Sequence, residues 1–205
     1  MKQPATEGLL VDGTSAPTAE EDSGSVELLD GTSIPYHAIA PDNASALQRF
    51  HHRLSERSIY LRFFAAKPEL SDREAVYFTN LDKINRFALV AVDPEGPEEI
   101  IGVVSFDREG TTERAEYAAE VEDSWQGRGL GLALTRRLVE AALKRDIRTF
   151  TAFVLPQNRG MLHLLRGLGL PESSRYEDGT DYIEIDLSPP QDTSDRTAAG
   201  SGPQD

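Results

Sequence analysis

The sequence predicts a mixed α/β (α+β) fold organised around one central sheet. Three observations support this prediction. Short apolar runs typical of strands recur through the middle of the chain, and segments with the spacing of amphipathic helices separate them. From residue 115 on, the patterns alternate strand, helix, strand, helix and strand. With 205 residues and no internal repeat, the chain suits a single domain.

Spacing and turn signals predict the elements in order. Asp30-Gly31 between two apolar runs is typical of a hairpin, and Asp42 is placed to cap the first helix. Ser71 and Glu74 form a capping box, which begins another helix. In chain order, the patterns predict strands at 26–29 and 34–39, a helix at roughly 43–54, strands at 87–92, 100–106 and 115–122, a helix at 130–144, a strand at 150–155, a short helix at 158–168 and a final strand at 182–187.

The two ends differ from the middle in composition. Residues 1–24 are rich in Thr, Ala, Glu, Gly and Pro, and residues 188–205 contain no large apolar side chain. Such segments bury too little apolar surface to offset the entropy that is lost on ordering. We therefore expect disordered tails over 1–24 and 188–205, and a folded domain over 25–187.

Composition excludes several classes of function. The formal net charge of −14 disfavours binding to nucleic-acid phosphates and favours cationic partners. Because there is no cysteine, disulfides, thiol catalysis and cysteine zinc sites are excluded, and the four histidines show no metal-binding spacing. The longest apolar run, 87–92, is far shorter than the ~20 residues of a membrane span, and the N-terminus lacks the apolar run of a signal peptide. We expect a soluble, cytoplasmic protein with no metal, no nucleic-acid partner and no membrane partner.

The most informative segment is the glycine turn, which we define as residues 126–131, Gln-Gly-Arg-Gly-Leu-Gly. A predicted strand runs into this turn, and the turn opens directly onto a predicted helix. Unpaired backbone N–H groups at a helix N-terminus form an anion site, which the helix dipole also favours. The spacing matches neither the GxxxxGK[ST] of P-loop proteins nor the dinucleotide-binding GxGxxG, because residue 132 is leucine.

The letters Gln126-x-x-Gly129-x-Gly131 resemble the hallmark of the GNAT superfamily of acetyl-CoA-dependent N-acetyltransferases. Further segments resemble the acetyltransferase domain of bacterial Pat-type protein lysine acetyltransferases: residues 57–64 and 70–74, which resemble its first helices, the pair Ala115-Glu116, and Asn158. The resemblance covers about residues 25–187. It implies a GNAT fold, with a mixed, mostly antiparallel sheet, about four flanking helices, and fourth and fifth strands (115–122 and 150–155) that splay apart.

By this resemblance, acetyl-CoA is the acyl donor. Its pantetheine arm would lie between the splayed strands, and its pyrophosphate would rest on the glycine turn. The resemblance assigns cofactor binding to Ala119, Val121, Gln126, Gly127, Arg128, Gly129, Leu130, Gly131, Leu132 and Asn158. Three of these have alternative interpretations: Arg128 as a solvated loop residue, Gln126 as a residue that shapes the turn, and Asn158 as a helix cap.

Acetylation of an amine requires a base, because an ammonium group has no lone pair to attack with. The resemblance assigns this role to Glu116, acting directly or through a water. Glu120 shares a face with Glu116 on a regular strand, about 13 Å away at ~3.3 Å per residue. We interpret Glu120 as part of an acidic, solvated face, or secondarily as an attraction for a cationic substrate. A bulge, usual in this strand of GNAT proteins, would change the shared face.

One position departs from many GNAT enzymes, in which a tyrosine seven residues after the asparagine protonates the leaving thiolate. This chain has Leu165 there, and Pat-type domains also look apolar at this position. The resemblance implies acetyl transfer to an amine, most of all to a protein lysine side chain. Two alternatives stay open: transfer to a small amine (a polyamine, an antibiotic or an amino acid), and a catalytically silent acyl-CoA sensor. A homodimer also stays open.

Overall fold

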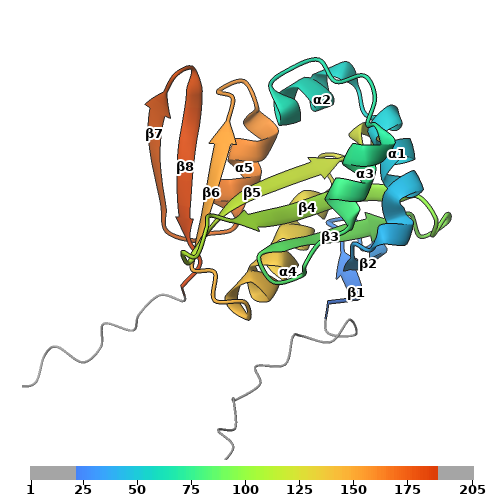
Figure 1. Ribbon diagram of the computed structural model, residues 1–205, viewed down its shortest axis with the longest axis horizontal. Helices are drawn as coiled ribbons and strands as arrows, with labels where there is room; N and C mark the ends of the chain where they lie inside the picture. The colour runs from blue at the N-terminus through green and yellow to red at the C-terminus, as the bar shows by residue number, and fades with distance from the viewer. Residues whose placement is uncertain (1–21, 189–205) are drawn as a thin grey trace, which may run out of the picture.

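The computed structural model describes residues 22–188, which form one eight-stranded sheet with helices on both faces (Figure 1). The strands are β1 (Gly24–Glu27), β2 (Ser33–Ala38), β3 (Arg86–Val92), β4 (Ile100–Arg108), β5 (Arg114–Val121), β6 (Thr149–Val154), β7 (Glu172–Glu177) and β8 (Thr180–Asp186). The helices are α1 (Ala44–Arg53), α2 (Glu56–Phe63), α3 (Asp72–Thr79), α4 (Leu130–Leu143) and α5 (Arg159–Gly167), with short 3-10 turns η1 (Pro41–Asn43) and η2 (Asp123–Trp125).

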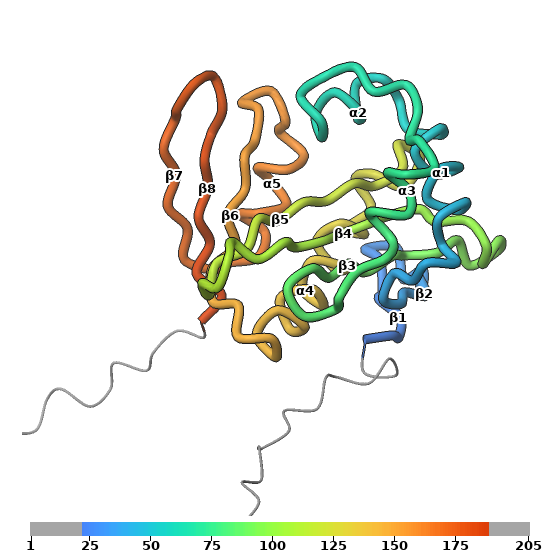
Figure 2. The backbone as a smooth tube through the Cα atoms, viewed as in Figure 1, coloured from blue at the N-terminus to red at the C-terminus, as the bar shows by residue number. Residues whose placement is uncertain are grey.

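The sheet has the order β1-β2-β3-β4-β5-β6-β8-β7, and every neighbouring pair is antiparallel except β5 and β6. The parallel pair is short, because Arg114–Glu116 pairs with Thr149–Thr151 and no further register follows. Beyond these positions the two strands run in different directions (Figure 2). The predicted mixed sheet with two splayed strands is therefore confirmed.

Each face of the sheet has its own apolar core. Helix α4 covers one face, where Leu134 and Leu138 are fully buried in a cluster with side chains of the strands and of α5. Helices α1, α2 and α3 cover the other face around Phe50 and Ile59. Strand β3 lies between both layers and is buried along nearly its whole length, which explains its uninterrupted apolar sequence.

Two element predictions need correction. Strand β7 was not predicted, because all its residues are exposed and its sequence, Glu-Ser-Ser-Arg-Tyr-Glu, has no apolar face. It pairs with β8 through a turn in which Asp178 and Gly179 both have positive φ, a pair typical of two-residue hairpins. Helix α1 has Asn43 as its N-cap, and Asp42 lies in the preceding 3-10 turn.

The folded region begins earlier than expected. Strand β1 starts at Gly24, and the buried carboxylate of Asp22 pairs with the buried guanidinium of Arg145 at 2.7 Å. The remainder of the two expected tails, 1–21 and 189–205, lies outside the described residues. Across residues 22–188, no helix has the length and apolar character needed to cross a bilayer.

Candidate functional site

The separation of β5 from β6 leaves one edge of β5 without a strand partner. The N–H of Glu122 donates to the carbonyl of Ile101 on β4, at 2.9 Å. Because backbone groups in an antiparallel ladder alternate in direction, even-numbered residues of β5 face β4 and odd-numbered residues face away. The backbone groups of Ala119 and Val121 therefore face the side that β6 has left, as pairing with a pantetheine arm requires.

The glycine turn leaves a row of backbone N–H groups unpaired at the start of α4, within the residues that the structure describes. Within residues 22–188, the backbone N–H groups of residues 127–132 donate to no protein acceptor, and the first helical bond of α4 runs from Ala133 to Gly129. Gly127 and Gly129 have φ values of 72° and 90°, in the region that favours glycine. This row of free donors at a helix N-terminus fits a pyrophosphate.

Gly131 is required for packing rather than for backbone conformation. A Cβ built at this position would lie 2.8 Å from Cδ1 of Leu164 on α5, so its missing side chain allows α4 and α5 to pack closely. A Cβ at Gly129 would lie 3.0 Å from Cγ of Leu29, in the turn between β1 and β2. The N–H of Leu29 also donates to the carbonyl of Arg128, so this turn supports the glycine turn.

Three of the expected cofactor residues make protein contacts. Gln126 and Asn158 match their alternative interpretations, whereas Arg128 is bound to neighbouring side chains rather than being a solvated loop residue. Gln126 donates from Nε2 to the carbonyl of Val121 at 2.9 Å, which ties the glycine turn to the end of β5. Arg128 pairs with Asp30 at 2.8 Å and stacks over Trp125, so its charge already has a partner. Asn158 is the N-cap of α5 and accepts from the N–H of Met161 at 3.1 Å. The remaining residues, Leu130 and Leu132, contribute backbone N–H groups at the start of α4.

Glu116 is the last residue of β5 that pairs with β6, and its side chain is exposed on the face covered by α1, α2 and α3. The register between β4 and β5 runs without a shift from Gly102 to Arg108, so no bulge interrupts β5. Glu116 and Glu120 therefore share one face, as a regular strand predicts.

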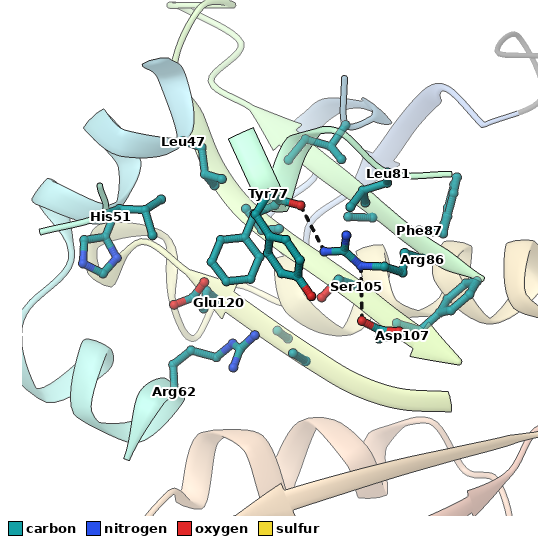
Figure 3. A pocket seen from close by; sticks show the side chains of 18 of the residues that line it. Leu47, His51, Arg62, Tyr77, Leu81, Arg86, Phe87, Ser105, Asp107 and Glu120 are labelled. Atoms are coloured by element: carbon teal, nitrogen blue, oxygen red, sulfur yellow. Dashed lines mark hydrogen bonds and ion pairs between the residues drawn. The ribbon is translucent and has the colours of Figure 1, made fainter. Parts of the chain in front are cut away.

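Both glutamates line a cavity of about 210 Å³ between this face of the sheet and the three N-terminal helices. We call it the α1–α3 cavity. In Figure 3, Glu120 points into it from β5, between His51 of α1, Arg62 of α2 and Tyr77 of α3. Apolar side chains such as Leu47 and Phe63 form much of the wall.

Contrary to the expectation from the sequence, Glu120 does not lie on a solvated acidic face. Its Oε1 atom is fully buried, and among residues 22–188 this atom has no hydrogen-bond partner. Burial raises the pKa of the Glu120 carboxyl, and the positive charges of Arg62 and His51 oppose that rise only in part. The sequence does not predict this environment, because the cavity is formed by helices that lie far from β5 along the chain.

Other side chains around the cavity are already paired. Arg86 binds Asp107 at 3.2 Å and stacks on Tyr77, with its carbon Cζ 3.9 Å from the ring centre. His51 is buried, and its Nε2 lies 2.7 Å from the carbonyl oxygen of Lys67.

Leu165, at the position of the missing tyrosine, is buried in the core beside α4. The described residues contain no group of three or more potential metal ligands.

A comparison with protein families matches residues 47–170 to the acetyltransferase (GNAT) family. The chain belongs to the GNAT family of acetyltransferases. The resemblance read from the glycine turn is thus confirmed, and so is the GNAT fold, with five helices rather than about four.

Comparisons with individual proteins also point to acetyltransferases. The GNAT domain of the PAT protein of S. lividans superposes with a TM-score of 0.77 at 34% identity, covering 83% of this chain and 99% of that one. The acetyltransferase Pat of Mycolicibacterium smegmatis is 33% identical over 142 residues, 68% of this chain, which spans only 41% of that protein's length. An acetyltransferase of Pseudomonas aeruginosa is 26% identical over 172 residues, covering 83% of this chain and 92% of the relative. The chain is therefore a GNAT acetyltransferase related to Pat proteins.

Proposed function

We propose that this chain is an acetyl-CoA-dependent N-acetyltransferase that modifies the side-chain amine of a protein lysine, with Glu116 as the general base. One observation carries the proposal. Strands β5 and β6 separate directly after Glu116, and the unpaired edge of β5 leads to the row of free N–H groups at residues 127–132. An unpaired strand edge that ends at free N–H groups suits an extended molecule with a diphosphate at one end and a reactive group beside Glu116.

The residues that would hold the cofactor follow from these free groups. The N–H groups of residues 127–132 bind the pyrophosphate, and the backbone of Ala119 and the N–H of Val121 bind the pantetheine arm. Gln126 and Asn158 act through the shape of the turn and the start of α5, rather than through the ligand. When bound, acetyl-CoA supplies the acetyl group as a thioester.

Glu116 accepts one of the two protons that acetylation of a lysine ammonium releases. Its carboxylate takes one proton from the lysine ammonium, directly or through a water, and frees the nitrogen lone pair. The nitrogen then forms the new C–N bond, the C–S bond breaks, and the departing sulfur carries the electron pair. The nitrogen releases its second proton to water, which leaves a neutral amide. Leu165 has no proton to give, so the thiolate leaves without a donor at that position, as a thiol pKa of about 8.5 permits.

The choice of lysine rests on two supports. The relatives with the higher identity are Pat proteins, which the sequence resemblance links to protein lysine acetylation. In addition, Glu116 lies at one end of the α1–α3 cavity, opposite Asp107 in the β4–β5 register. Asp107 pairs with Arg86, whereas the carboxylate of Glu116 forms no ion pair within residues 22–188, so its negative charge favours the approach of a cationic side chain.

Labelled acetyl-CoA tests the proposal with three acceptors: a peptide with blocked ends and a single lysine, spermidine, and a mixture of free amino acids. We expect label in the peptide and none in a copy whose lysine is replaced by arginine. Label confined to spermidine or to amino acids would show a small-amine enzyme instead. Acetyl-CoA binding without label in any acceptor would show a silent sensor.

A further inference from the structure

The proposed base does not account for Glu120. Its carboxyl lies inside the α1–α3 cavity, opposite the apolar Val103 in the β4–β5 register, and its Oε1 has no hydrogen-bond partner in residues 22–188. A buried carboxylate without a partner is costly, and native structures rarely retain one without a reason. A cationic ligand would supply the missing partner.

The charged and titratable groups around Glu120 come from every element that encloses the cavity. They are His51 on α1, Arg62 on α2, Tyr77 on α3, Arg86 on β3, Asp107 on β4 and Glu116 on β5. Arg86 is committed to Asp107, and His51 to the carbonyl of Lys67. Arg62 faces Glu120 (Figure 3), but no ion pair joins the two across the part of the chain that the structure describes. The charge of Arg62 therefore leaves the buried Oε1 of Glu120 without a hydrogen-bond partner within residues 22–188.

The distance between the two glutamates defines what such a ligand must look like. Glu116 and Glu120 are four residues apart on one face of an unbroken strand, which separates their Cα atoms by about 13 Å. An amine that reacts beside Glu116 therefore cannot also contact the carboxylate of Glu120. A second positive charge on the same acceptor can contact it, if an apolar stem joins the two charges along the walls of the cavity.

We propose that Glu120 is a specificity-determining residue that selects acceptors carrying a second positive charge. This inference rests on the proposed function, since it assumes that the acceptor amine reacts beside Glu116. The shared chemistry is a dication with an aliphatic spacer. It occurs in a lysine with a neighbouring basic residue, and it also occurs in a polyamine.

Acceptor pairs that differ in one charge test the proposal. The first arm uses a series of single-lysine peptides in which one position near the lysine carries an arginine. Each is compared with a matched peptide that has alanine at that position. The second arm compares straight-chain diamines of increasing length with monoamines of equal length. In the wild type, we expect kcat/KM to be at least about tenfold higher for the best dication than for its singly charged match, with the difference in KM. The arm that shows the preference identifies the source.

The enzyme variants are Glu120→Gln and, as a matched control, Glu113→Gln. Glu113 is an exposed glutamate directly before β5. Glu120→Gln should abolish the preference and leave kcat for the singly charged acceptor within about twofold, whereas Glu113→Gln should keep the preference. Arg62→Ala should increase the preference, because it removes the competing cation. A preference that survives in Glu120→Gln would overturn the inference, as would a kcat that collapses for both kinds of acceptor.

A binding measurement separates this inference from the proposed function. Calorimetry with 1,8-diaminooctane requires no acetyl transfer, and we expect binding to the wild type that weakens at least about tenfold in Glu120→Gln. If the wild type acetylates the lysine peptide but binds the diamine no better than Glu120→Gln does, the proposed function stands and the role of Glu120 fails. If no acceptor is acetylated but Glu120-dependent binding is seen, the proposed function fails and the cation site stands.

Discussion

Gln126 donates a hydrogen bond from its side-chain amide to the main-chain carbonyl of Val121, at 2.9 Å. The same nitrogen lies 3.2 Å from Oγ of Ser58 on α2, so one side chain joins the end of β5, the glycine turn and the helix over the α1–α3 cavity. The first letter of the Gln-x-x-Gly-x-Gly motif thus has a structural explanation that requires no contact with a ligand.

Replacement of Gln126 by glutamate should weaken acetyl-CoA binding through the shape of the turn. The variant keeps the size of the side chain but places a carboxylate against the carbonyl of Val121. A hydrogen bond of this kind contributes about 1 kcal/mol, so the Kd for acetyl-CoA should rise about threefold to tenfold. Calorimetry measures this change, and an unchanged Kd would show that the turn keeps its shape without Gln126.

Gly127→Glu should abolish acetyl-CoA binding, because it brings bulk and negative charge to the proposed pyrophosphate site. Gly110→Glu is the matched control. Both glycines have positive φ, 72° and 63°, and a Cβ at either would meet no atom within 4 Å. The backbone strain should therefore be similar, while only Gly127 belongs to the glycine turn. Equal loss of affinity in both variants would mean that strain, and not the site, controls binding.

The sequence predicted most of the fold because most elements carry a local signal. The capping box of Ser71 and Glu74 begins α3 as expected, and the hairpin around Asp30-Gly31 forms β1 and β2. Strand β7 has no such signal, since no side chain of it is buried. Its Asp178-Gly179 turn, directly before a predicted strand, was the one available indication.

The candidate site likewise has one part that the sequence predicted and one part that it did not. The glycine turn is a contiguous motif and was predicted, whereas the environment of Glu120 depends on His51, Arg62 and Tyr77, which lie more than forty residues earlier in the chain. The buried pair of Asp22 and Arg145 is separated by 123 residues. No spacing rule predicts contacts of this kind, because they depend on how separate elements pack together.

The raised pKa of Glu120 predicts a pH-dependent cost to stability. A carboxyl whose pKa is higher in the folded state destabilises that state as the pH rises from its unfolded value, about 4.3, to its folded value. Glu120→Gln removes this cost. Its free energy of unfolding relative to the wild type should therefore increase with pH through this window and then level off, by about 1.4 kcal/mol per unit of pKa shift. Urea unfolding from pH 4 to 8 measures it, and a constant difference would contradict the assignment.

Asp22→Asn should destabilise the protein more than a surface change. The guanidinium of Arg145 is buried, stacks on Phe87, and also donates to the carbonyls of Lys83 and Ala141. Loss of its only carboxylate partner among the described residues leaves a buried positive charge, which typically costs about 3–5 kcal/mol. Urea unfolding tests this, with Asp42→Asn as the exposed control. A loss below about 1 kcal/mol would show that the pair contributes little.

Steady-state kinetics of Glu116→Gln test the central claim most directly. Glutamine keeps the shape of the side chain but takes no proton at neutral pH. General-base catalysis is worth about 10²–10⁴-fold, so kcat for the lysine peptide should fall by that factor while the Kd for acetyl-CoA stays within about twofold. Glu113→Gln, which removes an exposed carboxylate three residues away, should leave both unchanged. A Glu116→Gln variant that keeps most of its kcat would contradict the account.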